Sequence, residues 1–196
     1  MRALLVVNPN ATTTTVRSRD VLARALGSQV HLDVAYTEQR GHAADLARQA
    51  ARDGVDLLVT LGGDGTVNEV ANGLLTADSG EAANRAHERP ALAVVPGGST
   101  NVFARAVGMP KDWTEGTGVI LEALREGRTR TVGLGRADER FFTFCAGFGI
   151  DAEVIRRVEQ ARRRGRTSTP GLYLRSTVAQ YLTTDARKTP AITLER

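Results

Sequence analysis

A glycine-rich turn between an apolar run and an amphipathic segment constrains this chain more than any other feature. The apolar run 55–60 predicts a buried strand, and residues 67–76 place apolar side chains at helical spacing. Gly62, Gly63 and Gly65 lie between them, and glycine permits positive φ angles and close backbone approach. The unpaired N–H groups that begin a helix then form an anion site, which a phosphate commonly fills.

An acidic residue inside this turn narrows the chemistry. Asp64 would repel a bare phosphate, so the turn needs a cation or a proton beside it, and this combination indicates Mg²⁺-nucleotide chemistry. A purely structural interpretation is also open, because Thr66 and Glu69 have the spacing of a helix capping box. Spacing alone does not decide between the two interpretations.

Composition fits a chain of one or two domains without a secretory leader. The 196 residues are 41% hydrophobic, which is enough for a core. The single cysteine, Cys145, cannot form an internal disulfide, and its apolar neighbours predict core packing rather than a nucleophile. The apolar run after Met1 is too short for a signal peptide, and no run approaches the length of a membrane span. We therefore expect a protein that is soluble or peripheral to a membrane.

The net charge of +4 comes largely from arginines, which are concentrated in residues 156–166. An anionic membrane, an acidic substrate or nucleic acid could use such a patch. The alternative is a solvated helix face with Glu153–Arg157 and Glu159–Arg163 pairs. Aromatic residues make up only 5% of the chain and do not interleave with the arginines, so nucleic acid is not expected as a partner.

Apolar runs and helical patterns alternate along the N-terminal part of the chain, which predicts an α/β fold with a doubly wound parallel sheet. In such sheets ligands bind beyond the carboxyl ends of the strands. We expect Asn8-Pro9, the Gly62 turn and a second glycine turn at Gly97 to gather there. Strands are predicted at 3–7, 30–37, 55–61 and 91–95, and helices after the threonine run 12–15, at 41–54, at 67–76, after Asn101 and at 113–126.

The pattern changes after Gly127. Residues 1–128 are predicted to form a nucleotide-binding α/β domain, and residues 129–196 the start of a second, strand-rich domain. A last strand at 191–195 has no partner after it, so the second domain is expected to be cut off at Arg196. The other predicted elements are a loop at 77–90, strands at 131–134 and 140–146, a turn at 147–151, and helices at 152–164 and 172–184.

The sequence GGDGTVNEV at 62–70 resembles the signature of the diacylglycerol kinase catalytic domain family, which includes bacterial diacylglycerol kinases and sphingosine kinases. Asn72-Gly73, PGGSTNVFAR at 96–105 and AGFGIDA at 146–152 extend the match, as do Asn8-Pro9, Tyr36-Thr37 and Gly41-His42-Ala43. The glycine-aspartate-glycine turn alone also occurs in NAD kinases and phosphofructokinases. The longer match, joined to the 96–105 block, is more specific.

The resemblance implies a nucleotide-binding α/β domain related to NAD kinase, followed by a β-sandwich that carries much of the lipid site. It implies transfer of the ATP γ-phosphate to a lipid hydroxyl with Mg²⁺, most simply diacylglycerol to phosphatidic acid. Asp64 would be the catalytic residue, because it would organise the metal-bound phosphates or activate the acceptor hydroxyl. No residue is assigned as a direct metal ligand. The residues implied to bind the nucleotide are Asn8, Pro9, Asn10, Ala11, Thr12, Thr37, Gly62, Gly63, Asp64, Gly65, Thr66, Val67, Asn68, Glu69, Gly98, Ser99 and Asn101.

Two departures from the family pattern bear on these residues. Ala11-Thr12 stand where the family often has serine and glycine, and Ser99 stands where threonine is usual, so a hydroxyl survives at both places. The resemblance also implies a lipid substrate at the inner face of a membrane and a cytoplasmic, peripheral location. The alternatives are an NAD kinase-like enzyme and a nucleotide-binding module without catalysis. Homodimerisation stays open.

Overall fold

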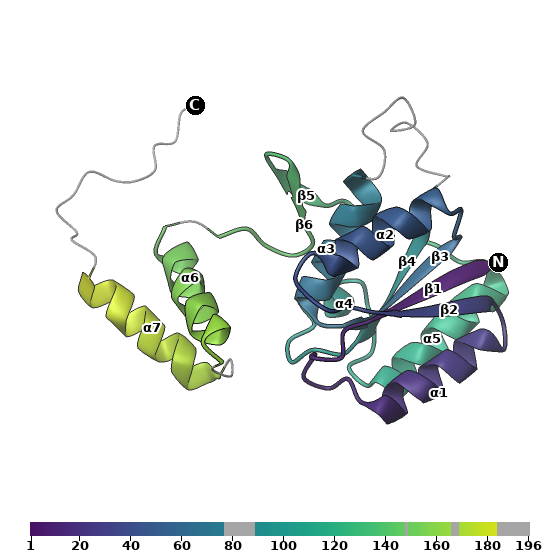
Figure 1. The fold of residues 1–196 in the computed structure, drawn as a ribbon, viewed down its shortest axis with the longest axis horizontal. Coiled ribbons are helices and arrows are strands. Elements are labelled where there is room, and N and C mark those ends of the chain that lie inside the picture. The colour runs from purple at the N-terminus through teal and green to yellow at the C-terminus, as the bar shows by residue number, and fades with distance from the viewer. Residues whose placement is uncertain (77–88, 148, 166–168, 184–196) are drawn as a thin grey trace. The chain divides into compact units, whose positions relative to one another are not determined.

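The chain divides into two compact units, Met1–Phe144 and Cys145–Arg196 (Figure 1). The first unit contains a parallel sheet with helices packed on it, and the described part of the second consists of two helices. The computed structural model describes residues 1–76, 89–147, 149–165 and 169–183.

The strands of the first unit are β1 (Arg2–Val7), β2 (His31–Tyr36), β3 (Leu57–Gly62) and β4 (Ala91–Pro96). They form one parallel sheet in the order β2-β1-β3-β4, which confirms the predicted doubly wound sheet. The connection from β1 leads to one edge and the connection from β3 to the other. The carboxyl ends of β1 and β3 therefore form the topological switch point, where such sheets bind ligands.

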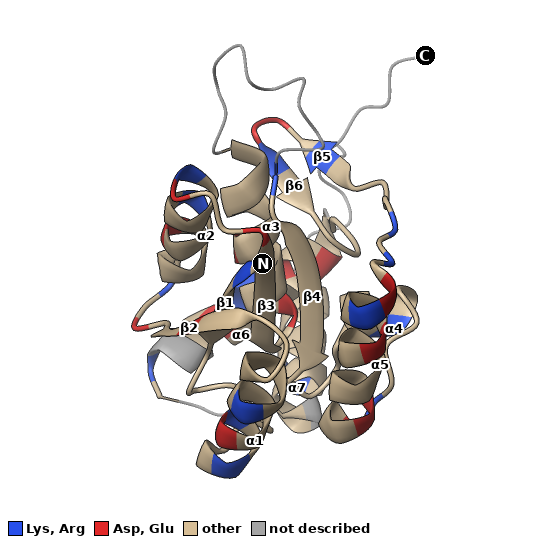
Figure 2. Cartoon of the chain, turned by 90° about the vertical axis from the view of Figure 1, so that its right-hand side faces the viewer, with Lys and Arg blue, Asp and Glu red and all other residues tan. Residues whose placement is uncertain are grey.

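Four helices cover the two faces of this sheet: α1 (Val16–Gly27), α2 (His42–Arg52), α3 (Asp64–Thr76) and α5 (Trp113–Glu126). α1 and α5 bury Leu22 and Ile120 against one face, while α2 and α3 bury Ala47 and Val70 against the other (Figure 1). Figure 2 shows charged residues along α1, α2 and α5, whereas β3 and β4 have none. The strands and the inward faces of the helices thus supply the core, and the outward faces of the helices supply the polar surface.

Local sequence signals set the ends of two helices. Thr15 and Ser18 form the capping box of α1, in which the Thr15 side chain accepts the Ser18 N–H at 3.0 Å. The threonine run was predicted to supply this cap. Asp112 Oδ1 accepts two backbone N–H groups of the first turn of α5, at 2.8 and 3.1 Å, and Gly127 ends the helix in the left-handed conformation. α5 has the predicted bounds.

Helix α3 lies directly against α2 at Gly73. A Cβ atom at this position would lie 2.4 Å from the carbonyl oxygen of Ala44 and 2.8 Å from Cβ of Ala47. Only glycine leaves room for this approach, so Gly73 sets how closely α3 packs on its neighbour.

A short helix and a hairpin complete the first unit: α4 (Val102–Ala106), β5 (Gly135–Ala137) and β6 (Arg140–Phe142). β5 and β6 pair in antiparallel fashion. Residues 131–134 lie within the described part of the chain and form no strand, so that prediction is wrong, and the strand predicted at 140–146 is wrong in extent. The chain reverses at Asp138, whose φ is 50°, and pairing covers only 135–137 and 140–142 beside this turn.

The described part of the second unit is a pair of packed helices, α6 (Ile150–Arg163) and α7 (Pro170–Thr183). They agree with the helices predicted at 152–164 and 172–184, and α6 takes up part of the turn predicted at 147–151. Val154, Val158 and Ser176 are buried.

Arginine side chains of α6 pair differently from the prediction. Glu153 accepts from Arg156 at 2.5 Å rather than from Arg157, so the expected Glu153–Arg157 pair is wrong. The reason is that Arg157 reaches α7, where it donates to Gln180 at 2.6 Å and to Thr183 at 3.1 Å. The side chain of Arg163, in the other expected pair, lies outside the described residues.

Cys145 is exposed, so the prediction of core packing is wrong. The pairing of β6 stops at Phe142, and Cys145 lies beyond the strand that was expected to bury it. Most of the predicted 77–90 loop and the 191–195 strand fall outside the described residues, and the β-sandwich stays a prediction. Among the described residues, no helix combines the length and apolarity that a membrane crossing requires.

Candidate active site

Three loops meet at the switch point of the sheet. The N–H of Asn8, just after β1, donates to the carbonyl of Leu61 in β3 at 3.0 Å. The N–H of Gly97, just after β4, donates to the carbonyl of Gly62 at 2.8 Å, and its own carbonyl accepts from Thr13 at 2.9 Å. The structure thus brings together the Asn8 loop and both glycine turns.

The glycines of the two turns allow their backbones to touch. A Cβ on Gly98 would lie 2.6 Å from Cα of Gly63, and one on Gly97 would lie 2.8 Å from the nitrogen of Gly62. None of these four glycines has a positive φ, nor does Gly65, so these turns do not use the left-handed conformation that glycine permits. Close approach of two backbones, not a left-handed conformation, is what requires glycine here.

Thr66 does not cap the helix that follows the first turn. α3 begins at Asp64, and the N–H of Val67 already donates to the carbonyl of Gly63, so Thr66 lies inside the first helical turn. The capping-box interpretation is therefore wrong. Thr66 is 5% exposed, and its hydroxyl accepts the side-chain amide of Asn8 at 3.0 Å. This bond joins the end of β1 to the start of α3.

Asp64 links the two glycine turns through its carboxylate. Its Oδ1 accepts the backbone N–H of Phe103, near the start of α4, at 3.1 Å. Within the described part of the chain this is the hydrogen bond found for the carboxylate, which leaves Oδ2 available as an oxygen ligand. Phe103 packs with Val67 and Val94 in a small apolar cluster behind the turns. The side chain of Asp64 is therefore oriented by a packed element.

Asn101 holds the second turn closed. Its side chain accepts the N–H of Gly98 at 2.9 Å and donates to the carbonyl of Gly98 at 2.7 Å, and its own φ is 48°. Both backbone groups of Gly98 are therefore engaged inside the loop. Ser99, beside it, is exposed, and its hydroxyl lies 3.4 Å from that of Thr100.

The other predicted site residues divide by exposure. In the loop after β1, Asn8 Oδ1 accepts the N–H of Asn10 at 3.0 Å. Thr37 is buried, with its N–H donating to the carbonyl of Val7 at 2.9 Å. Val67 points into the core, so only its backbone could reach a ligand. The exposed members are Pro9, Asn10, Thr12, Gly65 and Ser99, and the half-buried ones include Asn8, Ala11, Gly63, Asp64, Asn68, Glu69 and Gly98.

Two contacts of this region were not predicted from the sequence. Asn68 Oδ1 accepts the N–H of Thr143 at 3.2 Å, and Asn72 pairs with the backbone of Phe141. An asparagine repeated at a spacing of four on one helix was the available signal, since such residues lie on the same face.

At the carboxyl ends of the strands, the two glycine turns and the carboxylate of Asp64 form a candidate anion site. The carboxylate of Asp64 accepts a backbone amide, and no group of three or more histidine, cysteine, aspartate or glutamate side chains that could hold a metal occurs among the described residues. Mg²⁺ is commonly bound by one or two carboxylates together with phosphate oxygens and water, so a single carboxylate fits a metal that arrives with a nucleotide.

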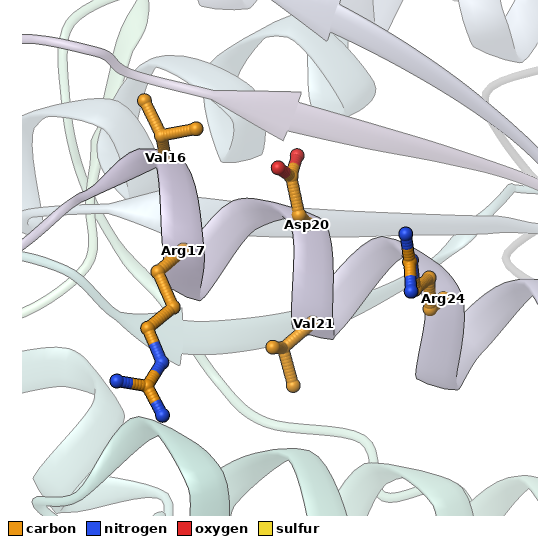
Figure 3. Close-up of a pocket in the computed structure, with 5 residues that line it drawn as sticks. All are labelled: Val16, Arg17, Asp20, Val21 and Arg24. Carbon is orange, nitrogen blue, oxygen red and sulfur yellow. The ribbon is translucent and has the colours of Figure 1, made fainter.

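A separate open hollow lies along α1 (Figure 3), and none of the predicted site residues lines it. Its lining comes entirely from one helix, and the five side chains are Val16, Arg17, Asp20, Val21 and Arg24. It contains none of the turns described above.

A model of the diacylglycerol kinase catalytic domain matches residues 2–137, which include the Asn8 loop and both glycine turns. The chain belongs to the diacylglycerol kinase catalytic domain family. The sheet, the two turns and Asp64 all lie within the matched residues.

Named relatives agree with this family. The chain is 34% identical over 136 residues to a protein named probable lipid kinase YegS-like from Chromohalobacter salexigens, covering 69% of this chain and 40% of the relative. It is 38% identical over 112 residues to the diacylglycerol kinase of Bacillus subtilis, covering 56% of this chain and 32% of that enzyme. The chain therefore spans less than half the length of these relatives.

The fold is also found among solved structures. A crystal structure of a diacylglycerol kinase from Bacillus anthracis str. Sterne matches with a TM-score of 0.59 and 29% identity, over 72% of this chain and 45% of that one. The similarity covers both sequence and backbone.

Proposed function

We propose that this chain is the nucleotide-binding and phosphoryl-transfer part of an ATP-dependent lipid kinase, which transfers the γ-phosphate to a lipid hydroxyl. Diacylglycerol is the acceptor we favour, with phosphatidic acid as the product, because diacylglycerol kinase is the name of the family and of the relatives. The observation that carries the proposal is Asp64, held by Phe103 between two touching glycine turns at the switch point of the sheet.

The residues of the edge suit this reaction. Phosphoryl transfer depends on positioning and on charge neutralisation more than on covalent chemistry by the protein. The exposed hydroxyls of Thr12 and Ser99 and the backbone around Gly65 would bind phosphate oxygens. Asp64 would hold the nucleotide's Mg²⁺ through Oδ2 while Oδ1 stays with Phe103. Mg²⁺, when bound, neutralises charge on the phosphates.

A second role of Asp64 would be to receive the proton of the acceptor hydroxyl. An alcohol is poorly acidic, and a carboxylate within hydrogen-bond reach is a suitable general base. Both roles require an ionised carboxylate at this place, and both are lost when the charge is removed.

Phosphate transfer from Mg-ATP labelled at the γ position, in mixed micelles, tests the proposal. The acceptors are diacylglycerol, sphingosine and NAD, and the matched variants are Asp64→Asn and Asp45→Asn, an exposed carboxylate on α2. Labelled lipid with wild type and Asp45→Asn but not with Asp64→Asn supports a lipid kinase. Labelled NADP alone would support the NAD kinase-like alternative. Nucleotide binding without transfer would indicate a binding module that lacks catalysis on its own.

We also propose that the protein acts at the cytoplasmic face of a membrane as a peripheral protein. The supporting observation is the arginine-rich stretch that includes the exposed Arg156 and Arg164. Such side chains favour an anionic surface, where a lipid substrate resides. Homodimerisation is a further proposal, for which sedimentation of the purified chain is the direct test.

A further inference from the structure

Helix α3 contacts the β5–β6 hairpin through two asparagines that are one turn apart. Asn72 Oδ1 accepts the N–H of Phe141 at 2.9 Å, and Asn72 Nδ2 donates to the carbonyl of Phe141 at 2.9 Å. Asn68 Oδ1 accepts the N–H of Thr143 at 3.2 Å. We call these contacts the asparagine ladder.

Only an amide side chain can make the Asn72 contact. The N–H of Phe141 requires an acceptor and its carbonyl requires a donor, so the pair also fixes which way the amide is turned. The same Nδ2 donates to the carbonyl of Asn68 at 2.7 Å, which holds the side chain along its own helix. Asp would lose the donor and Leu would lose both groups. Asn72 thus satisfies the backbone of β6 as a neighbouring strand would.

The ladder is partly shielded from solvent. Thr143 is 8% exposed, while Asn68, Asn72 and Phe141 are half-buried. Polar groups at such positions cost stability when they lose their partners. The contacts also join residues 69 and 75 positions apart in the chain. They therefore fix the position of the β6 end of the hairpin relative to α3, which the local sequence of neither segment would determine.

The ladder joins the helix that begins in the first glycine turn to the end of the first unit. α3 begins at Asp64, so the helix that carries the ladder is the one that starts in the first glycine turn. The residues held at the other end, Phe141 and Thr143, are the last ones before the first unit ends at Phe144. The ladder connects the turn to the point where the chain leaves this unit.

We propose that Asn72, together with Asn68, is a positioning residue that fixes the exit of the chain to the helix of the phosphate-binding turn, so that nucleotide bound at the turn stabilises residues 141–143. This inference rests on the proposed function for its nucleotide, and on the hydrogen bonds above for its structural part. Asn68, implied by the resemblance to bind the nucleotide, then acts through Thr143 instead of by direct contact.

Amide-resolved hydrogen exchange of the whole 196-residue chain tests the proposal, with and without Mg²⁺ and a non-hydrolysable ATP analogue. In the free protein, Asn72→Leu is expected to speed exchange at Phe141 by about tenfold, the effect of losing a buried hydrogen bond. Thr76→Val is the matched control, because Thr76 lies one turn further along α3 and its hydroxyl donates to the Asn72 carbonyl. It should leave exchange at Phe141 unchanged.

The nucleotide provides the readout that a merely structural role would not change. In the wild type it should slow exchange at Val67 and also at Phe141 and Thr143. In Asn72→Leu it should still slow exchange at Val67 but no longer at Phe141. If Asn72→Leu fails to fold, Asn72→Asp replaces it, because aspartate keeps the acceptor for the Phe141 N–H and loses only the donor. In Asn72→Asp the nucleotide should slow exchange at Phe141 less than it does in the wild type.

The outcomes separate this inference from the proposed function. Wild-type exchange at Phe141 in free Asn72→Leu would overturn the positioning role. Slowing at Val67 without slowing at Phe141 or Thr143 in the wild type would overturn the coupling and leave nucleotide binding intact. No slowing anywhere would overturn both the coupling and the proposed nucleotide site, while the exchange of the free variants would still decide the positioning role.

Discussion

Oδ1 of Asp64 accepts the backbone N–H of Phe103 at 3.1 Å. This bond crosses from the first glycine turn to the helix after the second, and it joins residues 39 positions apart. The carboxylate is thereby oriented before any ligand arrives. A charged group that is already in place needs less reorganisation during a reaction than one that must be ordered.

Asp64→Asn should abolish most phosphate transfer while preserving the fold. The amide oxygen of asparagine can still accept the Phe103 N–H, so the link between the turns survives and only the negative charge is lost. We expect the transfer rate to fall by about 100-fold or more, the range seen when a positioned acid–base group is removed. The melting temperature should stay at the wild-type value. A variant with normal turnover would contradict the role assigned to Asp64.

Alanine at Gly98 should disrupt the contact between the turns. Its Cβ would lie 2.6 Å from Cα of Gly63, and backbone atoms cannot move aside as a flexible side chain can. We expect a loss of about 1–3 kcal/mol in the free energy of unfolding, as for other overpacked sites. Gly65→Ala is the matched control, because a Cβ there has no atom within 4 Å. Urea denaturation measures the free energy of unfolding of both variants. Equal losses in Gly98→Ala and Gly65→Ala would argue against a close contact at Gly98.

Asp112 should give α5 a pH-dependent contribution to stability. The Thr114 hydroxyl first, and then the N–H groups of Glu115 and Thr114, lower the pKa of Asp112 from its ordinary 3.8. Since the folded pKa lies below the unfolded one, the contribution is complete above 3.8 and is lost as the pH falls through the folded value.

Thermal melts of wild type and Asp112→Asn across an acid pH series check this. The wild type should melt higher at neutral pH, and the difference should shrink once the pH falls below 3.8. Thr114→Val removes the largest cause of the shift, so its difference from the wild type should show the same acid dependence. A gap between wild type and Asp112→Asn that does not change with pH would contradict the assignment.

Binding to anionic vesicles should weaken with salt and with loss of exposed arginines from residues 156–166. Each basic side chain near such a surface contributes about 1 kcal/mol, or roughly fivefold in affinity. Arg156→Gln and Arg164→Gln should each lower the binding measured by vesicle sedimentation. Arg48→Gln is the control, because Arg48 lies on α2 and pairs with Asp45. Binding that is insensitive to salt would count against peripheral attachment through this stretch.

The sheet and most helices were predictable because they depend on local pattern. The six consecutive buried residues of β3 are apolar apart from Thr60 and Gly62, and α5 has a cap at Asp112 and a stop at Gly127. The place of β5 and the short extent of β6 were not predictable, because the left-handed turn at Asp138 sets where the chain reverses and only 135–137 and 140–142 pair beside it.

The candidate site was predictable in its location but not in its internal contacts. Parallel strands bring their carboxyl ends to one edge, so the grouping of Asn8 with the glycine turns follows from the alternating pattern. The partners of Asp64, Asn72 and Asn101 are backbone groups, which leave no residue-specific signal in a sequence. Val67 shows a second reason why the motif alone was not sufficient. It is part of the motif, but its side chain packs in the core and cannot itself contact a ligand.

The bond between Asn8 and Thr66 joins residues 58 positions apart, with β2 and two crossover helices between them. A nascent chain that has completed only β1 and β2 contains Asn8 but neither Thr66 nor the glycine turns. The proposed nucleotide site can therefore form only after β3 has paired with β1 on the side opposite β2. If the proposed nucleotide site is right, a chain that lacks β3 should not retain ATP, and nucleotide retention on stalled ribosomes of increasing chain length would record when the third strand is in place.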